Sequence, residues 1–242
     1  MINQIRSYIE KKRNSESIFW KGLILLKDRL RKSIINRYYW ESLILEDFKT
    51  ICFFIPKTAS SSFRVTFYEI IKNKKPEKFD DVYTLPRVLK KNIQKHEDYF
   101  KFTIMRDPYE KLLSCYYDFI IDKRRERVIR DFPFYYGMSF KEFVKVVCSI
   151  SDEESDTHFR SQHTFITNKG NLVVDYIAKY ENLEIEYPKI MKKMGIENIP
   201  KLPNIKKSKA KAKERKDLYT NEIKEMVYER YKKDFEIYED LK

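Results

Sequence analysis

Along the chain, continuous apolar runs typical of buried strands alternate with segments in which apolar residues have helical spacing. Apolar-rich runs with the length and the β-branched and aromatic content of buried strands occur at residues 50–56 (TICFFIP), 99–105 (YFKFTIM) and 172–180 (LVVDYIAKY). A helical spacing of apolar residues follows the first run, at Phe63, Phe67, Ile70 and Ile71. Strand followed by helix predicts an α/β fold with a parallel sheet, in which ligands bind at the carboxyl ends of the strands.

Capping residues mark the ends of several predicted helices. Pro108 stands at an early helical position after the second run, and Ser139 with Glu142 forms a capping box before another helix. Gly195 predicts the end of a helix that follows the third run. Further helices are expected after Pro86 and over residues 220–238.

The N-terminal part of the chain has a different pattern. Residues 17–38 place apolar residues near helical spacing, with basic residues between them. Such a helix can pack on the core or lie on an anionic membrane surface, and the pattern leaves both open. We expect residues 1–48 to be a helical extension packed on the core, with peripheral membrane contact as the alternative, and residues 49–242 to form the main domain.

Composition narrows the range of partners. The 242 residues carry a formal net charge of +13, and 42% of them are hydrophobic. This is enough apolar material for a core, and the positive charge either favours an anionic partner or reflects a Lys-rich coding bias. Basic and acidic residues are interleaved and no nucleic-acid-binding motif occurs, so we expect no nucleic-acid partner. We interpret the charge run at 123–131 (KRRERVIRD) as a solvated helix end or loop.

Cysteine content and hydropathy bear on location. Cys52, Cys115 and Cys148 are an odd number without metal-ligand spacing, which is typical of a reducing compartment. No stretch has membrane-spanning length, and the first residues lack the hydrophobic region of a signal peptide. We expect a soluble cytoplasmic protein, or one that is peripheral to the inner face of the membrane.

Residues 55–62 (IPKTASSS) lie between the first predicted strand and its helix. A helix N-terminus presents unpaired amides and a partial positive charge, which suit phosphate or sulfate. Lys57 adds a cation, and short hydroxyls come from Thr58, Ser60, Ser61 and Ser62. The glycine frame of a Walker A loop is absent. The stretch predicts either an anion site or only a capped helix start.

A second stretch, RDPYEKLLS, follows the second predicted strand. Arg106 stands where the strand ends, and Ser114 lies about two turns into the helix that begins near Pro108. An arginine fork and a serine hydroxyl can hold one phosphate group from two sides.

These two stretches, as FFIPKTASSSF and FKFTIMRDPYEKLLSCYYDF, resemble the paired cofactor motifs of sulfotransferases that use 3′-phosphoadenosine 5′-phosphosulfate (PAPS). The resemblance is to the carbohydrate branch, which includes heparan 2-O- and chondroitin 4-O-sulfotransferases and bacterial relatives. DTHFRSQ is similar to a His-aromatic-x-x-Gln element of that branch, and DYIAKYENLEIEY and LYTNEIKEMVYERYKKDFEIY are similar to its later segments. The similarity runs in pieces over about residues 51–238.

The resemblance implies a P-loop-like three-layer fold, with a central parallel sheet flanked by helices. It implies a bacterial, PAPS-dependent enzyme that sulfates a carbohydrate or glycolipid, and no metal. Arg106 and Ser114 would hold the 3′-phosphate of PAPS. The 5′-phosphosulfate would be held by Lys57, Thr58, Ala59, Ser60, Ser61 and Ser62. As a catalytic residue, Lys57 would also stabilise charge on the leaving group.

The acceptor hydroxyl also needs a base. Relatives often have a His between the two cofactor motifs, near where this chain has Tyr83. His158, in the His-aromatic-x-x-Gln element, is our first choice as the catalytic base, with a structural or acceptor-binding role as the alternative. The weaker candidates are His96, Glu69, Asp80, Asp81 and His163.

Two further stretches have two interpretations each. FPFYYG (132–137) either stacks on sugar rings or packs in the core. The basic run at 206–216 (KKSKAKAKERK) either closes over the nucleotide or is a flexible surface segment. For the whole protein, the alternatives are a nucleotide-dependent kinase or NTPase and an inactive nucleotide-binding relative, the latter raised by Tyr83.

Overall fold

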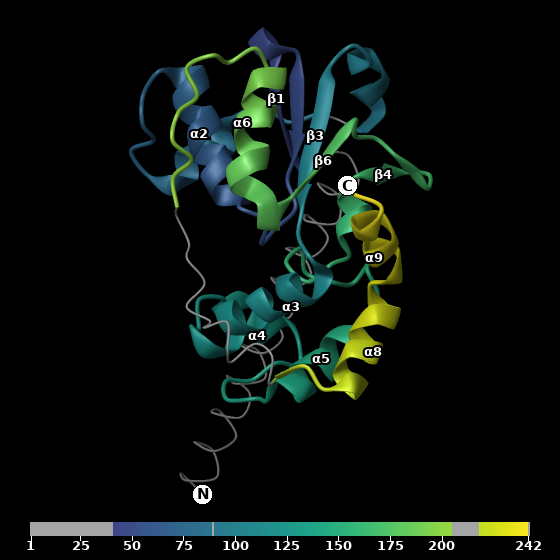
Figure 1. The fold of residues 1–242 in the computed structure, drawn as a ribbon. Coiled ribbons are helices and arrows are strands. Elements are labelled where there is room, and N and C mark those ends of the chain that lie inside the picture. The colour runs from purple at the N-terminus through teal and green to yellow at the C-terminus, as the bar shows by residue number, and fades with distance from the viewer. Residues whose placement is uncertain (1–40, 89, 205–217, 242) are drawn as a thin grey trace, which may run out of the picture.

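The computed structural model describes residues 41–88, 90–204 and 218–241 (Figure 1). The predicted amphipathic helix at 17–38 and the basic run at 206–216 both lie outside the described residues. Within the described ranges, no helix is long and apolar enough to span a membrane.

A four-stranded sheet organises the upper part of the molecule in Figure 1. Its strands are β1 (Ser42–Leu45), β2 (Thr50–Phe53), β3 (Phe100–Met105) and β6 (Tyr176–Lys179), in the order β1-β2-β3-β6. β2, β3 and β6 are parallel, and β1 pairs with β2 in the antiparallel direction. The predicted α/β class with a largely parallel sheet is confirmed.

β1 lies inside the segment that the sequence assigned to an N-terminal extension. A short 3-10 turn, η1 (Glu46–Phe48), reverses the chain so that β1 pairs with β2 along its full length. All residues of β1 are buried. The sheet domain therefore begins before the boundary expected between residues 48 and 49. A run as short as SLIL does not predict a strand until its pairing partner is known.

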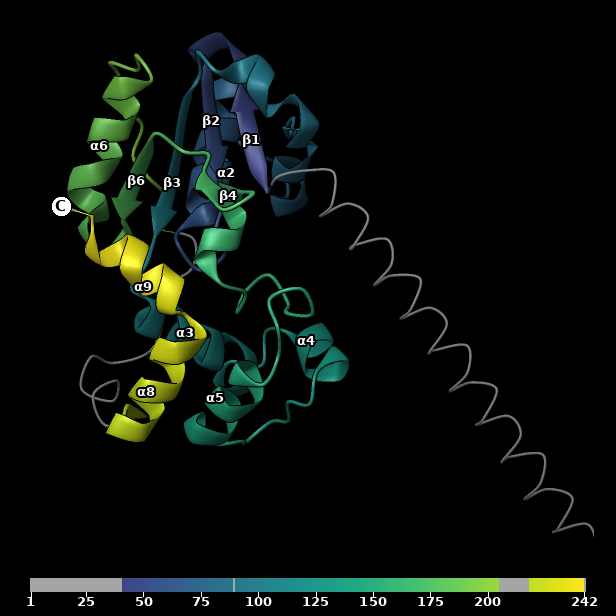
Figure 2. The same cartoon turned by 90° about the vertical axis from the view of Figure 1, so that its right-hand side faces the viewer.

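Helices cover both faces of the sheet (Figures 1 and 2). α2 (Ser60–Lys72) and α6 (Leu183–Lys193) lie on one face, where Phe63 and Phe67 pack against Phe102 of β3. The other face is covered by α9 (Lys232–Glu239), the 3-10 turn η5 (Gln162–Phe165) and the hairpin of β4 (Thr167–Asn168) and β5 (Asn171–Leu172). This is the predicted three-layer arrangement.

A second, helical part of the molecule, here called the helical lobe, lies below the sheet in Figure 1. It comprises α3 (Pro108–Tyr116), a π-helical turn η4 (Tyr117–Ile121), α4 (Glu126–Asp131), α5 (Phe140–Cys148) and α8 (Asn221–Arg230). Its core is rich in aromatic rings. From the FPFYYG stretch, Phe134 joins this core, whereas Tyr135 and Tyr136 are exposed. Because α3 follows β3 closely, the lobe is positioned by the end of a central strand.

Several helix ends are as predicted, and three elements differ. Ser139 and Glu142 form the capping box of α5, and Gly195 has a positive φ of 78° after α6. Between Pro86 and β3, where a helix was predicted, the described residues form only the 3-10 segment η3 (Lys90–His96). The third predicted strand contributes only β6 to the main sheet. The closing helix is broken into α8 and α9 at Tyr231, whose buried hydroxyl donates to the carbonyl of Phe159 at 2.5 Å.

Candidate functional site

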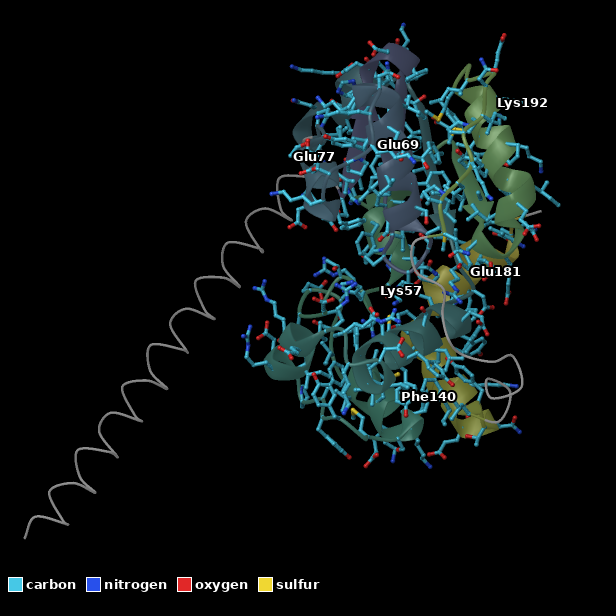
Figure 3. All side chains as sticks on the ribbon, turned by 90° about the vertical axis from the view of Figure 1, so that its left-hand side faces the viewer. Lys57, Glu69, Glu77, Phe140, Glu181 and Lys192 are labelled. Atoms are coloured by element: carbon cyan, nitrogen blue, oxygen red, sulfur yellow. The ribbon has the colours of Figure 1, made fainter. Side chains whose placement is uncertain are left out.

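A cleft of about 690 Å³ runs along the edge of the sheet where the parallel strands end. Its wall contains residues of the sheet side and of the helical lobe, and Lys57 lies between these two parts in Figure 3. Ligand pockets typically have about 300–1,000 Å³. The position agrees with the rule that α/β sheets bind ligands at the carboxyl ends of their strands.

The loop after β2 has a tightly turned backbone. Lys57 and Ala59 have φ angles of 73° and 63°, in the left-handed region that is unfavourable for residues other than glycine. α2 begins directly afterwards at Ser60, and no side chain of the described chain caps its N-terminus. The cleft wall includes Lys57, Ala59, Ser60, Ser61 and Ser62. Helix amides, hydroxyls and a cation therefore meet at one place, which suits an anion.

Thr58 supports this loop from behind. Its buried hydroxyl donates to the carbonyl of Ile55 at 2.8 Å, and the residue is not part of the cleft wall. The sequence grouped Thr58 with the ligand-binding hydroxyls. The structure shows that its side chain shapes the turn instead.

Arg106 follows β3 directly and is buried against the cleft. Its guanidinium donates to the carbonyl of Lys57 at 3.3 Å and to Glu110 at 3.4 Å, and it lies 4.6 Å from the ring centre of Tyr180. These bonds are long, and the buried Nε has no hydrogen-bond partner within the described part of the chain. Arg106 therefore retains donor capacity for an anion. Ser114 of α3 lines the same cleft.

Gln162 of η5 fixes the backbone of Arg106. Its side-chain oxygen accepts from the Arg106 N–H at 3.0 Å, and its side-chain amide donates to the Arg106 carbonyl at 2.7 Å. The backbone N–H groups of Gln162 and His163 donate in turn to Asp234 of α9, at 2.6 and 2.8 Å. Gln162 and Asp234 are both 0% exposed. A buried chain of hydrogen bonds therefore connects α9 to the end of β3.

Asp118 of η4 is surrounded by basic side chains in the cleft. Its carboxylate lies 3.1 Å from Lys57 Nζ, accepts from Arg125 Nε at 3.0 Å and lies 3.9 Å from Arg124. Burial acts to raise the pKa of Asp118, but Lys57 and Arg125 hold it below its ordinary value. The sequence placed the 123–131 run in solvent and missed this cluster.

His158 lines the cleft from the helical lobe. Its Nδ1 lies 2.6 Å from a carboxylate oxygen of Asp156, which also accepts from the His158 N–H at 3.0 Å. An ionised carboxylate only accepts, so Nδ1 carries the proton and Nε2 is the acceptor. Burial lowers the pKa of His158, against the opposing effect of Asp156, so the imidazole is neutral near pH 7.

Two side chains of α3 hold the backbone beside His158. The buried ammonium of Lys111 donates to the carbonyls of His158 and Arg160 at 2.9 and 2.8 Å. The thiol of Cys115 lies 3.2 Å from the same His158 carbonyl. The sequence singled out neither Asp156 nor Lys111. A lysine between the apolar positions of α3 was the signal for the second.

The other candidate bases fall into two groups. Asp80, on the 3-10 segment η2 (Phe79–Thr84), is part of the cleft wall. So is Tyr83 of the same segment, which stands near where relatives have a histidine. The residues outside the wall are Glu69, which lies on α2 (Figure 3), Asp81, His96 and His163. Asp81 accepts backbone amides at the start of η2, and the ring of His163 lies 2.8 Å from Asp234. The structure therefore brings His158, Asp80 and Tyr83 to the cleft with Lys57.

The cleft residues fit a nucleotide that carries a separate 3′-phosphate. The Lys57 loop and the Arg106–Ser114 pair are two cationic or donor-rich sites at neighbouring strand ends. Apolar surface next to them comes from Tyr180, Leu183, Tyr187 and Leu202, and suits a base ring. No group of three or more His, Cys, Asp or Glu side chains in the described ranges is arranged to hold a metal ion.

Known proteins match much of this chain. A sequence model of the sulfotransferase family matches residues 40–239. Carbohydrate sulfotransferase 10 of Xenopus laevis is 28% identical over 166 residues, which cover 58% of this chain and 47% of that protein. An uncharacterized protein of Archaeoglobus fulgidus is 32% identical over 100 residues, 41% of this chain and 71% of that protein. The chain spans about half the length of the Xenopus relative, and no solved structure matches.

Proposed function

Because the chain belongs to the sulfotransferase family, we propose that it transfers the sulfuryl group of PAPS to a hydroxyl of a carbohydrate or glycolipid. The family and the two anion-binding sites of the cleft support PAPS as the donor. The name of the Xenopus relative, a carbohydrate sulfotransferase, supports a carbohydrate acceptor.

The contact between the two cofactor motifs carries this proposal. Lys57 and Arg106 are 49 residues apart in the sequence, yet the Arg106 guanidinium donates to the Lys57 carbonyl at 3.3 Å. One ligand can therefore engage both residues. A nucleotide with phosphate groups at its 5′ and 3′ positions has its anionic groups separated in the required way, whereas ATP has all of them at one end.

Three residues, His158, Asp156 and Lys57, have distinct roles in this reaction. When bound, PAPS supplies a sulfuryl group whose bond to a phosphate oxygen breaks as the acceptor oxygen forms the new S–O bond. His158 accepts the hydroxyl proton through Nε2, and Asp156 orients the ring. Lys57 stabilises negative charge on the departing phosphate oxygen. Positioning and charge stabilisation dominate such loose transition states.

Nucleotide binding is tested by thermal unfolding with 3′,5′-ADP, the nucleotide product of the reaction. At about 100 times Kd the ligand should stabilise the folded state by about 2.7 kcal/mol. Arg106→Ala should abolish the shift, while Arg130→Ala, which removes an exposed arginine of α4, should retain it. A shift with ATP but none with 3′,5′-ADP would contradict the proposal and favour the NTPase alternative.

Catalysis is tested by transfer from radiolabelled PAPS to a panel of glycans and lipid-linked sugars. We expect labelled product with the wild type and a large loss with His158→Ala. Nucleotide binding without transfer to any acceptor of the panel would instead favour an inactive, nucleotide-binding relative.

A further inference from the structure

The cleft continues past the phosphate loop to the β1 edge of the sheet. Glu41 precedes β1, and its carbonyl accepts from the N–H of Phe54 at 2.7 Å, so it lies beside the end of β2. This end of the cleft wall consists of Glu41, Phe54, Arg64, Phe79, Asp80 and Tyr83. The nucleotide sites described above use none of these residues.

The order of the strands shows on which side of the proposed nucleotide the β1 end of the cleft lies. Arg106 follows β3, the Lys57 loop follows β2, and Glu41 precedes β1, which is antiparallel; these strands are consecutive neighbours in the sheet. A donor held by Arg106 and by the loop has its sulfuryl end at the loop, on the side of β1. In-line transfer requires the acceptor opposite the leaving group. The acceptor therefore belongs at the β1 end.

Glu41 is held there as a fixed carboxylate. Arg64 of α2 hydrogen-bonds to one of its oxygens and is only 6% exposed, with its guanidinium 3.9 Å from the ring centre of Phe54. Arg87 lies 3.8 Å from the other oxygen. The positive charge of Arg64 is thereby compensated. The Glu41 side chain is still 28% exposed, so it can accept hydrogen bonds from a ligand.

Tyr83 adds a flat apolar surface to this end. The residue is 48% exposed and lines the cleft. Phe79 packs against it edge-on at 5.7 Å, and the Arg64 guanidinium lies 5.2 Å from its ring centre. The ring is therefore fixed in place although one side is open. An exposed, fixed aromatic ring offers contact area at low entropic cost.

We propose that the β1 end of the cleft binds a neutral sugar ring of the acceptor, an inference that rests on the proposed function. Tyr83 contacts the apolar C–H face of the ring, and Glu41 accepts hydrogen bonds from its hydroxyl groups. Asp80 places a second carboxylate in the same wall. This carboxylate is exposed, and it opposes an anionic sugar at this position because like charges repel. The charge of Glu41 is already paired with Arg64 and Arg87.

Saturation-transfer NMR on the full chain saturated with 3′,5′-ADP tests this without catalysis. The neutral probes are methyl β-glucoside, methyl β-galactoside and methyl β-N-acetylglucosaminide, and the anionic probe is methyl β-glucuronide. We expect at least one neutral probe to bind, and the glucuronide to bind about fivefold more weakly. Tyr83→Ala and Glu41→Gln should each weaken neutral binding about fivefold, the value of one hydrogen bond or contact near 1 kcal/mol.

Matched variants separate this outcome from general damage. Tyr135→Ala and Glu77→Gln change exposed residues outside the cleft wall and should leave glycoside binding unchanged. The inference would be overturned if the Tyr83 and Glu41 variants bound neutral glycosides as well as the wild type does. It would also be overturned if the wild type preferred the glucuronide or bound no neutral glycoside. Affinity for 3′,5′-ADP is measured in the same samples. If the wild type did not bind 3′,5′-ADP, the proposed function itself would be contradicted. If it binds the nucleotide but no neutral sugar, only the proposed sugar subsite is contradicted.

Discussion

At the scale of single residues, the molecule fixes His158 before any ligand is present. Asp156 binds its ring, Lys111 donates to its carbonyl, and Phe119 packs edge-on against it at 5.7 Å. Proton transfer depends on the geometry of a hydrogen bond, so a base that is held from several sides is preorganised for it. The same contacts bury the imidazole and so determine its protonation.

The pH profile of kcat/KM, which reports pKa values of the free enzyme, should reflect this burial. Burial lowers the pKa of His158, and a base acts only when neutral, so the acid limb should lie below about pH 6.5, the ordinary value for histidine. Asp156 raises that pKa, so Asp156→Asn should move the limb to still lower pH. His158→Ala should reduce kcat by about 10²–10⁴-fold. The control is His96→Ala, outside the cleft wall. A limb at or above pH 6.5 would contradict the assignment.

Asp118 links the stability of the fold to acidic pH. Its folded pKa is lowered, so its contribution is fully present above the unfolded pKa of about 3.9 and is lost as the pH falls through the folded value. Asp118→Asn should reduce the free energy of unfolding at pH 7 by about 1–3 kcal/mol, because Lys57 and Arg125 lose a charged partner. It should also weaken the loss of stability below about pH 4.

Urea unfolding at pH 7 and pH 3 measures both effects of the Asp118 substitution. Asp47→Asn, which changes an exposed carboxylate of η1, is the matched control and should leave stability at pH 7 unchanged. A destabilisation by Asp118→Asn that is equal at both pH values would show that the carboxylate contributes by packing and not by charge.

At the scale of elements, the π-helical turn η4 positions Asp118, the acidic partner of Lys57, in the cleft wall. π-helical turns occur mostly within α-helices and frequently at functional sites, and the extra residue changes which side chains share a face. Here the turn follows α3 and carries Tyr117 and Asp118, both in the cleft wall. α3 thus brings Ser114 to the cleft, while its continuation provides the counter-charge of Lys57.

The contact between η5 and β3 should control nucleotide affinity. Gln162→Leu removes both hydrogen bonds to the backbone of Arg106 while keeping a side chain of similar size. We expect Kd for 3′,5′-ADP to rise about tenfold, because the backbone that positions the Arg106 guanidinium loses two supporting hydrogen bonds. Calorimetric titration measures Kd, and Gln94→Leu, on the exposed side of η3, is the control. Unchanged affinity with lowered Tm would make Gln162 a purely structural residue.

Contiguous segments made much of this architecture predictable. The apolar runs predict β2 and β3 because strands buried on both faces are nearly continuous in apolar residues, whichever strands they pair with. Each of the two cofactor motifs is also contained in one short segment. They sufficed for the sulfotransferase resemblance, which the match over residues 40–239 confirms. Glu41, Asp118 and Asp156 were missed because their positions depend on strand pairing, a π-helical turn and a loop between distant elements. None of these leaves a periodic signal in one segment.

At the scale of the whole molecule, the net charge of +13 should affect the binding of an anionic nucleotide more than that of a neutral sugar. Binding of 3′,5′-ADP should weaken several-fold between about 0.1 M and 1 M NaCl, because the Debye length falls from about 10 Å to about 3 Å. Neutral glycosides at the β1 end should respond little. Titrations at both salt concentrations check this, and equal salt dependence of the two ligands would contradict the separation. The cytoplasmic location stays a prediction.

The pairing of Gln162 with Arg106 has a consequence for motion. The Gln162 side chain hydrogen-bonds to both the N–H and the carbonyl of Arg106, the residue after β3, as the backbone of a neighbouring strand would. The Arg106 amide should therefore exchange with deuterium as slowly as those of the sheet, although it lies beyond the strand's last residue. Recognition of the nucleotide would then persist until the sheet itself opens, and mutations that loosen distant loops would leave it intact.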